Sequence, residues 1–324
     1  MTGSSEQLGA RGRHDGCDLA TPRFSVVIPT YQKASSLERA IDSVLAQTLA
    51  DFEVLVVDDG STDSTQAVLA GYRDPRLRAV FREHRGRCSA RNHGAARARG
   101  RWLVFLDSDD FVEPRWLERF AEALADPSVG IASCGLRVIL DDQRTGERAR
   151  FGQLPADLGP LYDRQAGIFL CGTFAVGREL FDAAGGYEET IAYAENTDLS
   201  LRLMAQCRRR GLRLARIPEE LLVFEKTRRQ LTPETCRERL VSAETILTRH
   251  GDTFRRDAPK SYAAYRRIAG THAARLGEIA RARRHFAAAV LGHPTGWRNY
   301  PRLLLTALPP LARRVWRPPI AEGS

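Results

Sequence analysis

Short apolar runs alternate with helix-like segments early in the chain, and this alternation constrains the fold more than any other feature. The runs cover residues 24–29, 53–57, 77–81 and 102–106. Between them, apolar residues recur every three or four positions, and helices are expected from about residues 35, 62 and 89. Strands that alternate with helices build a sheet covered on both faces. The sequence therefore predicts an α/β fold with a mostly parallel sheet.

The pattern changes after residue 107. Helices are predicted over 114–125, 179–184 and 195–209, a strand over 129–140, and a loop over 141–160. From about residue 233 onward only helical patterns occur. We expect three parts: a disordered tail over residues 1–22, an α/β domain over residues 23–235, and a helical, basic region over residues 236–324.

Positive charge is concentrated near the C-terminus. The net charge is +9, and residues 261–320 contain eleven Arg and one acidic residue, Glu278. With Glu322 counted, residues 1–260 are neutral overall. Aromatic and apolar residues lie among these arginines: Trp297, Tyr300, Trp316 and the run 303–305. This mixture suits peripheral contact with an anionic membrane surface, but a protein-binding surface or plain solvation explains it comparably well.

Other composition features narrow the location. The six cysteines show no zinc-binding spacing, which favours a reducing, cytoplasmic environment. Residues 1–22 lack the apolar core of a signal peptide, and no apolar run approaches the roughly 18 residues of a membrane span. The basic run 208–210 has no interleaved aromatic residues, so we expect no nucleic-acid partner.

Acidic residues follow two of the buried strands. Asp58 and Asp59 come after one strand, and Asp107, Asp109 and Asp110 come after another. Ligands of parallel sheets bind beyond the carboxyl ends of the strands, so both clusters should face one crevice. Their mutual repulsion would be relieved by a divalent metal that also binds substrate phosphates. The alternative is that these residues only form turns and cap helices.

Six segments, in order, carry a resemblance to a known family. They are residues 27–31 (VIPTY), 43–47 (SVLAQ), 56–63 (VVDDGSTD), 90–94 (ARNHG), 105–110 (FLDSDD) and 185–189 (GGYEE). From about residue 24 to residue 202 the chain resembles the family-2 glycosyltransferases. That resemblance implies a Rossmann-like GT-A fold, a nucleoside-diphosphate sugar donor, a divalent metal (Mg²⁺ or Mn²⁺) and inversion at the sugar.

The resemblance also implies roles for individual residues. Residues that would contact the donor nucleotide are Pro29, Thr30, Tyr31, Asp58, Asp59, Arg91, Asp107 and Ser108. An Asp of the 58–59 pair would hydrogen-bond the base, usually uracil. Asp107, Ser108 and Asp109 form the D-x-D element, in which Asp107 would lie toward the ribose. Asp109 would bind the metal, with Asp107 as a second ligand.

The chain departs from the family at the catalytic base. The usual Glu-Asp pair is replaced by Glu195 and Asn196, and an amide cannot accept a proton at neutral pH. Glu195 and Asp198 are three apart and share a helix face. Glu195 is the first candidate base and Asp198 the second. The alternative is that both acids only cap the helix.

These observations predict transfer of a single sugar from a nucleoside-diphosphate sugar, with a UDP-linked donor as the first choice, to an unidentified glycan, lipid-linked or small-molecule acceptor. The chain lacks the Gln-x-x-Arg-Trp element and the membrane spans of processive synthases. The second hypothesis is a non-catalytic protein that binds a sugar nucleotide and docks through its C-terminal helices. We expect residues 141–190 to read the acceptor.

Overall fold

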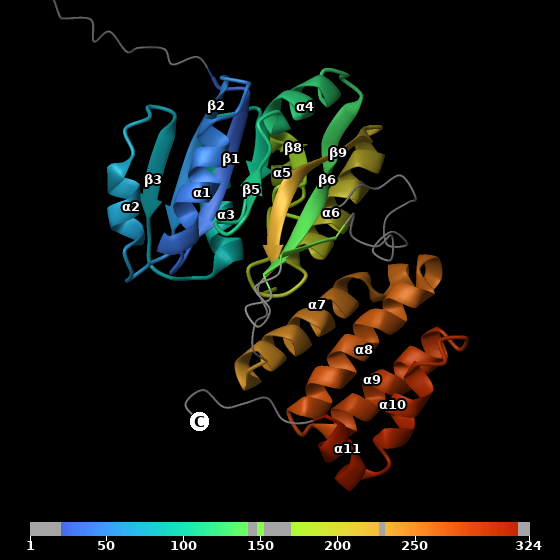
Figure 1. Cartoon of the computed structure of the whole chain (residues 1–324). Coiled ribbons are helices and arrows are strands. Elements are labelled where there is room, and N and C mark those ends of the chain that lie inside the picture. The colour runs from blue at the N-terminus through green and yellow to red at the C-terminus, as the bar shows by residue number, and fades with distance from the viewer. Residues whose placement is uncertain (1–20, 142–147, 152–169, 227–230, 317–324) are drawn as a thin grey trace, which may run out of the picture.

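A computed structural model describes residues 21–141, 148–151, 170–226 and 231–316. Of the expected N-terminal tail, only residues 21 and 22 lie in these ranges. Most of the segment predicted as a loop, 141–160, lies outside them as well. The described residues form one nine-stranded sheet flanked by helices, followed by a group of C-terminal helices (Figure 1).

The first half of the sheet is parallel, as predicted. Its strands are β1 (Phe24–Thr30), β2 (Phe52–Asp58), β3 (Leu77–Phe81) and β4 (Trp102–Phe105), in the order β3-β2-β1-β4. Helices α1 (Ala34–Leu45), α2 (Thr65–Gly71) and α3 (Arg87–Arg97) connect them. Every residue of β1, β2 and β4 is buried, which explains why their sequences are continuous apolar runs.

The second half of the sheet is mixed, with antiparallel pairs that the sequence pattern did not indicate. It contains β5 (Phe111–Val112), β6 (Val129–Asp141), β7 (Arg148–Phe151), β8 (Phe174–Gly177) and β9 (Arg213–Lys226). The elements α4 (Trp116–Ala123), α5 (Arg178–Ala183) and α6 (Glu195–Arg210) lie between them in sequence. The pairs β4–β8, β6–β8, β5–β9 and β6–β7 are antiparallel, whereas β6–β9 is parallel. Part of the predicted loop thus forms β7, which is held by pairing with β6.

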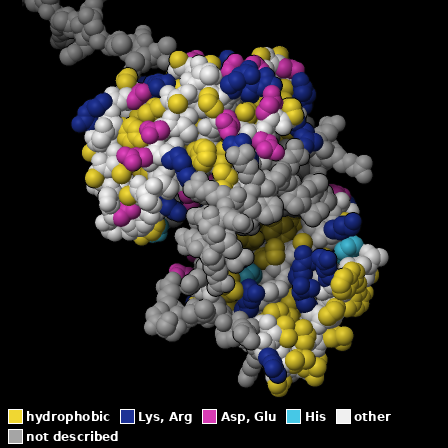
Figure 2. Space-filling model, in the orientation of Figure 1, with side chains coloured by type: hydrophobic (Ala, Val, Ile, Leu, Met, Phe, Trp, Pro, Cys, Tyr) yellow, Lys and Arg dark blue, Asp and Glu magenta, His cyan; other side chains and the backbone are white. Residues whose placement is uncertain are grey.

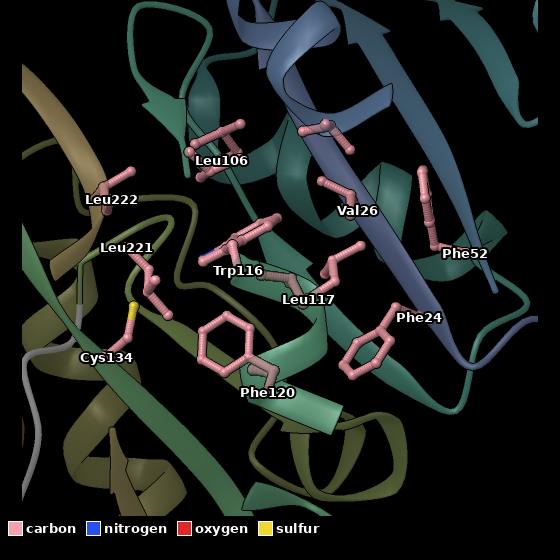
Figure 3. Packing of buried hydrophobic residues seen from close by; sticks show 14 of the residues in the cluster. Phe24, Val26, Phe52, Leu106, Trp116, Leu117, Phe120, Cys134, Leu221 and Leu222 are labelled. Atoms are coloured by element: carbon pink, nitrogen blue, oxygen red, sulfur yellow. The ribbon is translucent and has the colours of Figure 1, made fainter. Parts of the chain in front are cut away.

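Two hydrophobic cores lie on the two faces of the sheet. On one face, Phe24 and Val26 of β1 pack with α1 and α4, where Trp116 and Phe120 point toward the sheet (Figure 3). On the other face, Val27 packs with residues of α3, α5 and α6. Burying each large apolar side chain contributes about 1.5–3 kcal/mol, so these two layers fix the sheet edge at which the acidic clusters lie.

Helix α3 approaches the sheet closely because Gly94 has no side chain. A Cβ atom at this position would stand 2.4 Å from Cγ1 of Val27 and 3.0 Å from Cγ2 of Val57. The glycine of the segment ARNHG therefore allows the close packing that carries Arg91 to the carboxyl end of β4.

The C-terminal region is helical, as predicted. It consists of α7 (Pro233–Asp257), α8 (Pro259–Arg275), α9 (Ile279–Gly292), α10 (Asn299–Leu305) and α11 (Pro309–Val315). These helices share a third core that also includes Ile191, and the carboxyl ends of β1, β2 and β3 face toward them (Figure 1). Hydrophobic and basic side chains gather over the last helices (Figure 2). None of the helices in the described part of the chain combines the length and apolarity that a membrane crossing requires.

Candidate active site at the strand ends

The two acidic clusters meet at one cavity of about 460 Å³. Its lining includes, from the ends of β1, β2 and β4, Pro29, Thr30, Tyr31, Asp59, Asp107, Ser108 and Asp109. Asp58 is next to Asp59 and pairs in register with Thr30 across β1 and β2. The structure therefore brings together the residues that the sequence predicted for donor binding, with Asp58 and Arg91 next to the lining rather than in it.

Asp59 is held on all sides by the segment that follows β3. Its carboxylate accepts hydrogen bonds from the backbone N–H groups of Arg85 (3.2 Å) and Gly86 (2.7 Å). It also forms ion pairs with Arg82 (3.1 Å) and with His84 (2.9 Å) if that ring is protonated. Asp59 thus fixes the backbone of residues 82–86 at the edge of the cavity.

Asp58 and Thr30 offer unused hydrogen-bonding atoms. One carboxylate oxygen of Asp58 accepts from the backbone N–H of Ser61 at 3.0 Å. Among the described residues, Oδ2 of Asp58 and Oγ1 of Thr30 are buried and have no hydrogen-bond partner. Buried polar atoms without partners are rare and costly, which makes both atoms candidates for contact with a bound ligand.

Two stacked rings form part of the cavity wall. The Tyr31 and His84 rings lie 4.0 Å apart between centroids, with 25° between their planes. Tyr31 is 42% exposed, so this large apolar surface is open to the cavity. Exposed aromatic faces of this kind can stack on a nucleobase.

Arg91 lies behind the cavity and joins two carboxylates. Its guanidinium is fully buried, donates to Asp107 at 2.5 Å and to Glu195 at 3.1 Å, and lies over the Tyr187 ring. Burial opposes ionisation of Asp107, but the charge and hydrogen bond of Arg91 outweigh it and lower the pKa of Asp107. Arg91 is not part of the cavity lining and lies behind Asp107, which is.

Asp109 is paired with a lysine at the mouth of the cavity. Nζ of Lys33 lies 2.9 Å from Oδ2 of Asp109, and both side chains are about one third exposed. Protein cations therefore already offset the charge of Asp59, Asp107 and Asp109. The repulsion argument for a metal is correspondingly weaker than the sequence suggested.

The donor set still fits a hard cation that shares its shell with phosphates. Within the described ranges, no group of three or more His, Cys, Asp and Glu side chains is arranged to hold a metal on its own. Magnesium-type sites need only one or two carboxylates when a diphosphate supplies further oxygens. Asp107 and Asp109 both line the cavity and could provide these carboxylates.

The predicted base candidates lie deeper than the cavity lining. Glu195 is 6% exposed, and both of its ion pairs, with Arg91 and with Arg87 at 3.7 Å, use Oε1. Oδ1 of Asn196 accepts hydrogen bonds from the Tyr187 hydroxyl at 3.1 Å and the Cys171 thiol at 3.7 Å. Asn196 is thereby fixed by two groups that donate to an oxygen.

Asp198 is fully buried in a cluster of basic groups. It pairs with Arg202 at 2.6 Å and with His250 of α7 at 2.8 Å. Burial opposes its ionisation, but the hydrogen bonds from His250 and Arg202 outweigh burial and lower the pKa of Asp198. This geometry favours the structural alternative for Asp198, in which it holds α6 against α7.

The comparison with protein families decides the classification. Residues 25–184 match the model described as glycosyl transferase family 2. The chain belongs to glycosyltransferase family 2.

One relative of this family-2 chain is itself a glycosyltransferase from a bacterium. The glycosyltransferase EpsJ of Bacillus subtilis (strain 168), itself described as uncharacterised, is 30% identical over 221 residues. That match covers 65% of this chain and 63% of EpsJ, so the chain spans less than two thirds of this relative.

Two solved structures share the GT-A fold. TarS 1-349 of S. aureus, in complex with UDP-GlcNAc, superposes with a TM-score of 0.59 at 18% identity and covers 91% of this chain and 88% of that one. The mannosyltransferase PcManGT of Pyrobaculum calidifontis, in complex with GDP-Man and Mn²⁺, gives 0.54 at 22% identity, with coverage of 92% and 88%. At these identities the likeness shows the fold alone.

Sequence reasoning missed several residues of the cavity lining, and those with ionisable side chains that could bear charge are Lys33, His84, Arg85, Arg87, Glu189 and Glu238. Lys33 and His84 follow β1 and β3, so their position after a predicted strand was an available signal. Glu189 ends the segment GGYEE, and its Oε1 accepts from Nδ2 of Asn92 at 3.1 Å. Glu238 comes from α7, whose return to the sheet edge has no local sequence signal.

Proposed function

We propose that the chain transfers a single sugar from a nucleoside-diphosphate sugar, with a UDP-linked donor as the first choice, to an acceptor hydroxyl. One observation carries this proposal: groups suited to a nucleoside and groups suited to a metal-bound diphosphate line the same cavity. The stacked rings of Tyr31 and His84, Thr30 with its unpartnered oxygen, and the D-x-D carboxylates all line this cavity, and Asp58 lies next to it.

Donor binding would use both sides of the cavity. The base would stack near Tyr31 and hydrogen-bond Asp58, whose Oδ2 has no partner among the described residues. Uracil suits a carboxylate acceptor because its ring N–H is a donor. UDP-GlcNAc and UDP bound to TarS support a uridine nucleotide, and GDP-Man bound to PcManGT supports a guanosine nucleotide as the second choice.

A divalent metal would be held by Asp109, with Asp107 as a second ligand. When bound, it would stabilise the negative charge that develops on the departing diphosphate. The Mn²⁺ in the PcManGT complex supports this choice of cofactor. Lys33 now neutralises Asp109, and its ammonium would be released toward the donor phosphates when Asp109 takes the metal.

The acceptor hydroxyl would attack the anomeric carbon directly, with inversion. We propose Glu195 as the base because its Oε2 takes part in neither of its ion pairs and because Arg91 links it to Asp107. The competing candidate is Glu189, which lines the cavity and is exposed. Candidate bases are often poorly aligned before substrate binds, so the burial of Glu195 does not remove it.

A non-catalytic nucleotide-binding protein is the second candidate function. The observation that favours it is Asn196 at the family's base position, where the Tyr187 hydroxyl and Cys171 thiol hold its oxygen. Residues 141–190 are expected to read the acceptor, and most of residues 141–169 lies outside the described ranges.

A panel of nucleotide sugars tests the main proposal. Thermal shift and release of free nucleotide are measured for UDP-, GDP-, and dTDP-linked sugars, with Mn²⁺ or with EDTA. The proposal expects stabilisation and slow metal-dependent hydrolysis with one nucleotide class. Stabilisation by a nucleotide without hydrolysis or transfer under any condition would favour the non-catalytic function, and no binding at all would exclude both.

We also propose a reducing, cytoplasmic location and peripheral contact with a membrane through the C-terminal helices. The five cysteines in the described ranges are all free and buried, which supports the first. The basic excess of residues 261–320 supports the second.

A further inference from the structure

The last two helices and the segment before them expose an unusual amount of apolar surface. Of the eleven large hydrophobic side chains most exposed among the described residues, seven lie between residues 291 and 315. The most exposed are Leu291 (81%), Trp297 (70%) and Leu304 (69%), and Leu308, Leu311 and Val315 follow at spacings of three or four. Large exposed apolar patches mark interaction sites.

This exposure belongs to helices that are firmly packed on their other side. Trp316 stacks on Phe286 at 5.5 Å between centroids with 17° between planes, and Ala312 is fully buried. Arg283 of α9 donates to the backbone oxygen of Thr306 at 2.6 Å. The inner side of α10 and α11 is therefore packed against the helical core, whereas the outer apolar side chains stay exposed.

The sequence that forms this surface is basic. Residues 279–321 include eight Arg and no Asp or Glu. Burial first, and then the neighbouring charges of Arg302 and Arg298, lower the pKa of Arg267. Arg302 and Arg298 therefore lie close enough to Arg267 to repel its charge. Figure 2 shows basic side chains interspersed with hydrophobic ones over these helices. We name the surface formed by Trp297, Arg298, Arg302, Leu304, Leu308, Leu311, Arg314 and Val315 the docking face.

We propose that the docking face binds an anionic phospholipid surface, with Trp297 and the leucines at the boundary between head groups and acyl chains. Its arginines would contact the lipid phosphates. This inference rests on the proposed peripheral contact and is independent of the transfer reaction.

The chemistry of the face argues against other occupants. A symmetric contact between two copies would bring the arginines of both copies together, with no acid in this segment to pair with them. Single-stranded nucleic acid binds to aromatic platforms, whereas this face is mainly aliphatic. An anionic bilayer satisfies both the apolar and the charged side chains.

Trp297 provides a built-in reporter for the test. The other three tryptophans are buried: Trp102 and Trp316 are 7% exposed and Trp116 is 0% exposed. The full chain is mixed with vesicles of phosphatidylglycerol or of phosphatidylcholine at low ionic strength, and tryptophan emission, acrylamide quenching and co-sedimentation are measured. We expect a blue shift, protection from quenching and co-sedimentation with phosphatidylglycerol alone, all reversed by salt.

Paired variants assign the binding to this face. Arg298→Gln with Arg302→Gln should weaken partitioning about fivefold for each arginine, which corresponds to about 1 kcal/mol per basic residue. Leu304→Ser with Leu308→Ser should abolish the protection of Trp297. Two controls are matched in chemistry but lie on the α/β domain: Arg208→Gln with Arg209→Gln, and Phe81→Ser, a side chain that is 55% exposed. They should bind vesicles like the unchanged chain.

Several results would overturn the inference. Equal binding to both lipids, no binding at low salt, or equal losses in the control variants would each exclude this face as an anionic-lipid site. A concentration-dependent blue shift without vesicles, together with a dimer by light scattering, would assign the face to a second copy. Donor hydrolysis is measured in parallel, so loss of vesicle binding with intact hydrolysis separates this inference from the proposed function.

Discussion

The buried guanidinium of Arg91 lies 2.5 Å from the carboxylate of Asp107, and this contact couples the interior of the domain to the D-x-D element. The same guanidinium reaches Glu195 at 3.1 Å. A carboxylate that lines the cavity and a carboxylate at the start of α6 are therefore held by one cation. The position of Asp107 depends on the packing of α3 as well as on the strand that precedes it.

Replacing Arg91 should cost stability. Arg91→Met leaves Glu195 buried without its closest cation, and breaking a buried ion pair in this way costs about 3 kcal/mol or more. Urea denaturation measures the change. Arg87→Gln is the control, because Arg87 is 42% exposed and lies 3.7 Å from the same carboxylate, and we expect a change within about 0.5 kcal/mol. Equal losses in the two variants would contradict the assignment.

Asp109 and Asp107 should differ in their effect on metal dependence. Asp109→Ala should abolish turnover and remove the effect of Mn²⁺ on binding of UDP, because the proposed metal ligand is lost. Asp107→Ala should have a smaller effect on the metal. Isothermal titration with Mn²⁺ and with EDTA provides the measurement, and Asp126→Ala, on an exposed turn, is the control. Near-normal metal-dependent turnover in Asp109→Ala would show that the D-x-D assignment is wrong.

Substitutions of Asp58 and of Asp59 should differ in their effects, because we expect Asp58 to act mainly in ligand binding and Asp59 also in local stability. Asp58→Ala should weaken UDP affinity by about 0.5–1.5 kcal/mol, the usual contribution of one hydrogen bond. Asp59→Ala should also lower the free energy of unfolding by about 1–3 kcal/mol, because the N–H groups of Arg85 and Gly86 lose their acceptor. Titration and denaturation are compared with those of Asp74→Ala, which precedes β3 at the opposite sheet edge. Unchanged UDP affinity in Asp58→Ala would move the nucleoside pocket elsewhere.

Local sequence was sufficient to predict a strand where that strand is buried on both faces of the sheet. The strands β1, β2 and β4 are continuous apolar runs, and the acids that follow them mark the correct sheet edge. The strands β8 and β9 were missed because their pairing is non-local: β9 contains Pro218 and several charged residues, and its partner β6 lies some eighty residues earlier. No local period can reveal such a pairing.

The candidate site shows the same division. Asp59, Asp107 and Asp109 were located from their position after strands, and the structure places them around one cavity. The partner of each acid could not be predicted. Lys33, Arg91 and His84 reach these carboxylates only through the packing of α1, α3 and the segment after β3. The sequence therefore indicated which carboxylates lie around the cavity, but not which basic side chains form ion pairs with them.

His272 should make stability depend on pH. Burial first, and then the charges of Arg239 and Arg275, lower the pKa of His272 to about 4. The folded state thus keeps the ring neutral, while the unfolded chain binds a proton below about pH 6.5. The stabilisation is present above pH 6.5 and is lost as the pH falls toward 4, by up to about 3 kcal/mol.

Urea denaturation between pH 7 and pH 4 tests this dependence. His272→Gln should show a flatter profile than the unchanged chain, because no imidazole must be kept neutral in the folded state. His293→Gln serves as a control outside the core and should leave the slope unchanged. A profile in His272→Gln as steep as that of the unchanged chain would assign the pH dependence to other groups.

The catalytic base is the prediction on which the proposed function depends most. Removing a general base typically lowers turnover by about 10²–10⁴-fold. Glu195→Gln should therefore reduce transfer at least a hundredfold while leaving UDP affinity unchanged. Because Glu195 also holds Arg91, the variant must be checked by denaturation and by its pH profile. Loss of a base removes the limb of the profile that reports its ionisation, whereas a positioning defect only lowers the whole curve.

Glu189→Gln is the matched comparison, since Glu189 lines the cavity and keeps a hydrogen bond from Asn92 through an oxygen that the amide retains. If Glu189→Gln loses turnover and its pH limb while Glu195→Gln keeps them, the base is Glu189. Asn196→Asp restores the family's carboxylate beside the Tyr187 hydroxyl, 3.1 Å from the present amide oxygen. Transfer that appears only in Asn196→Asp would mean that the unchanged chain binds the nucleotide without catalysis, because its base position carries an amide that cannot accept the acceptor's proton.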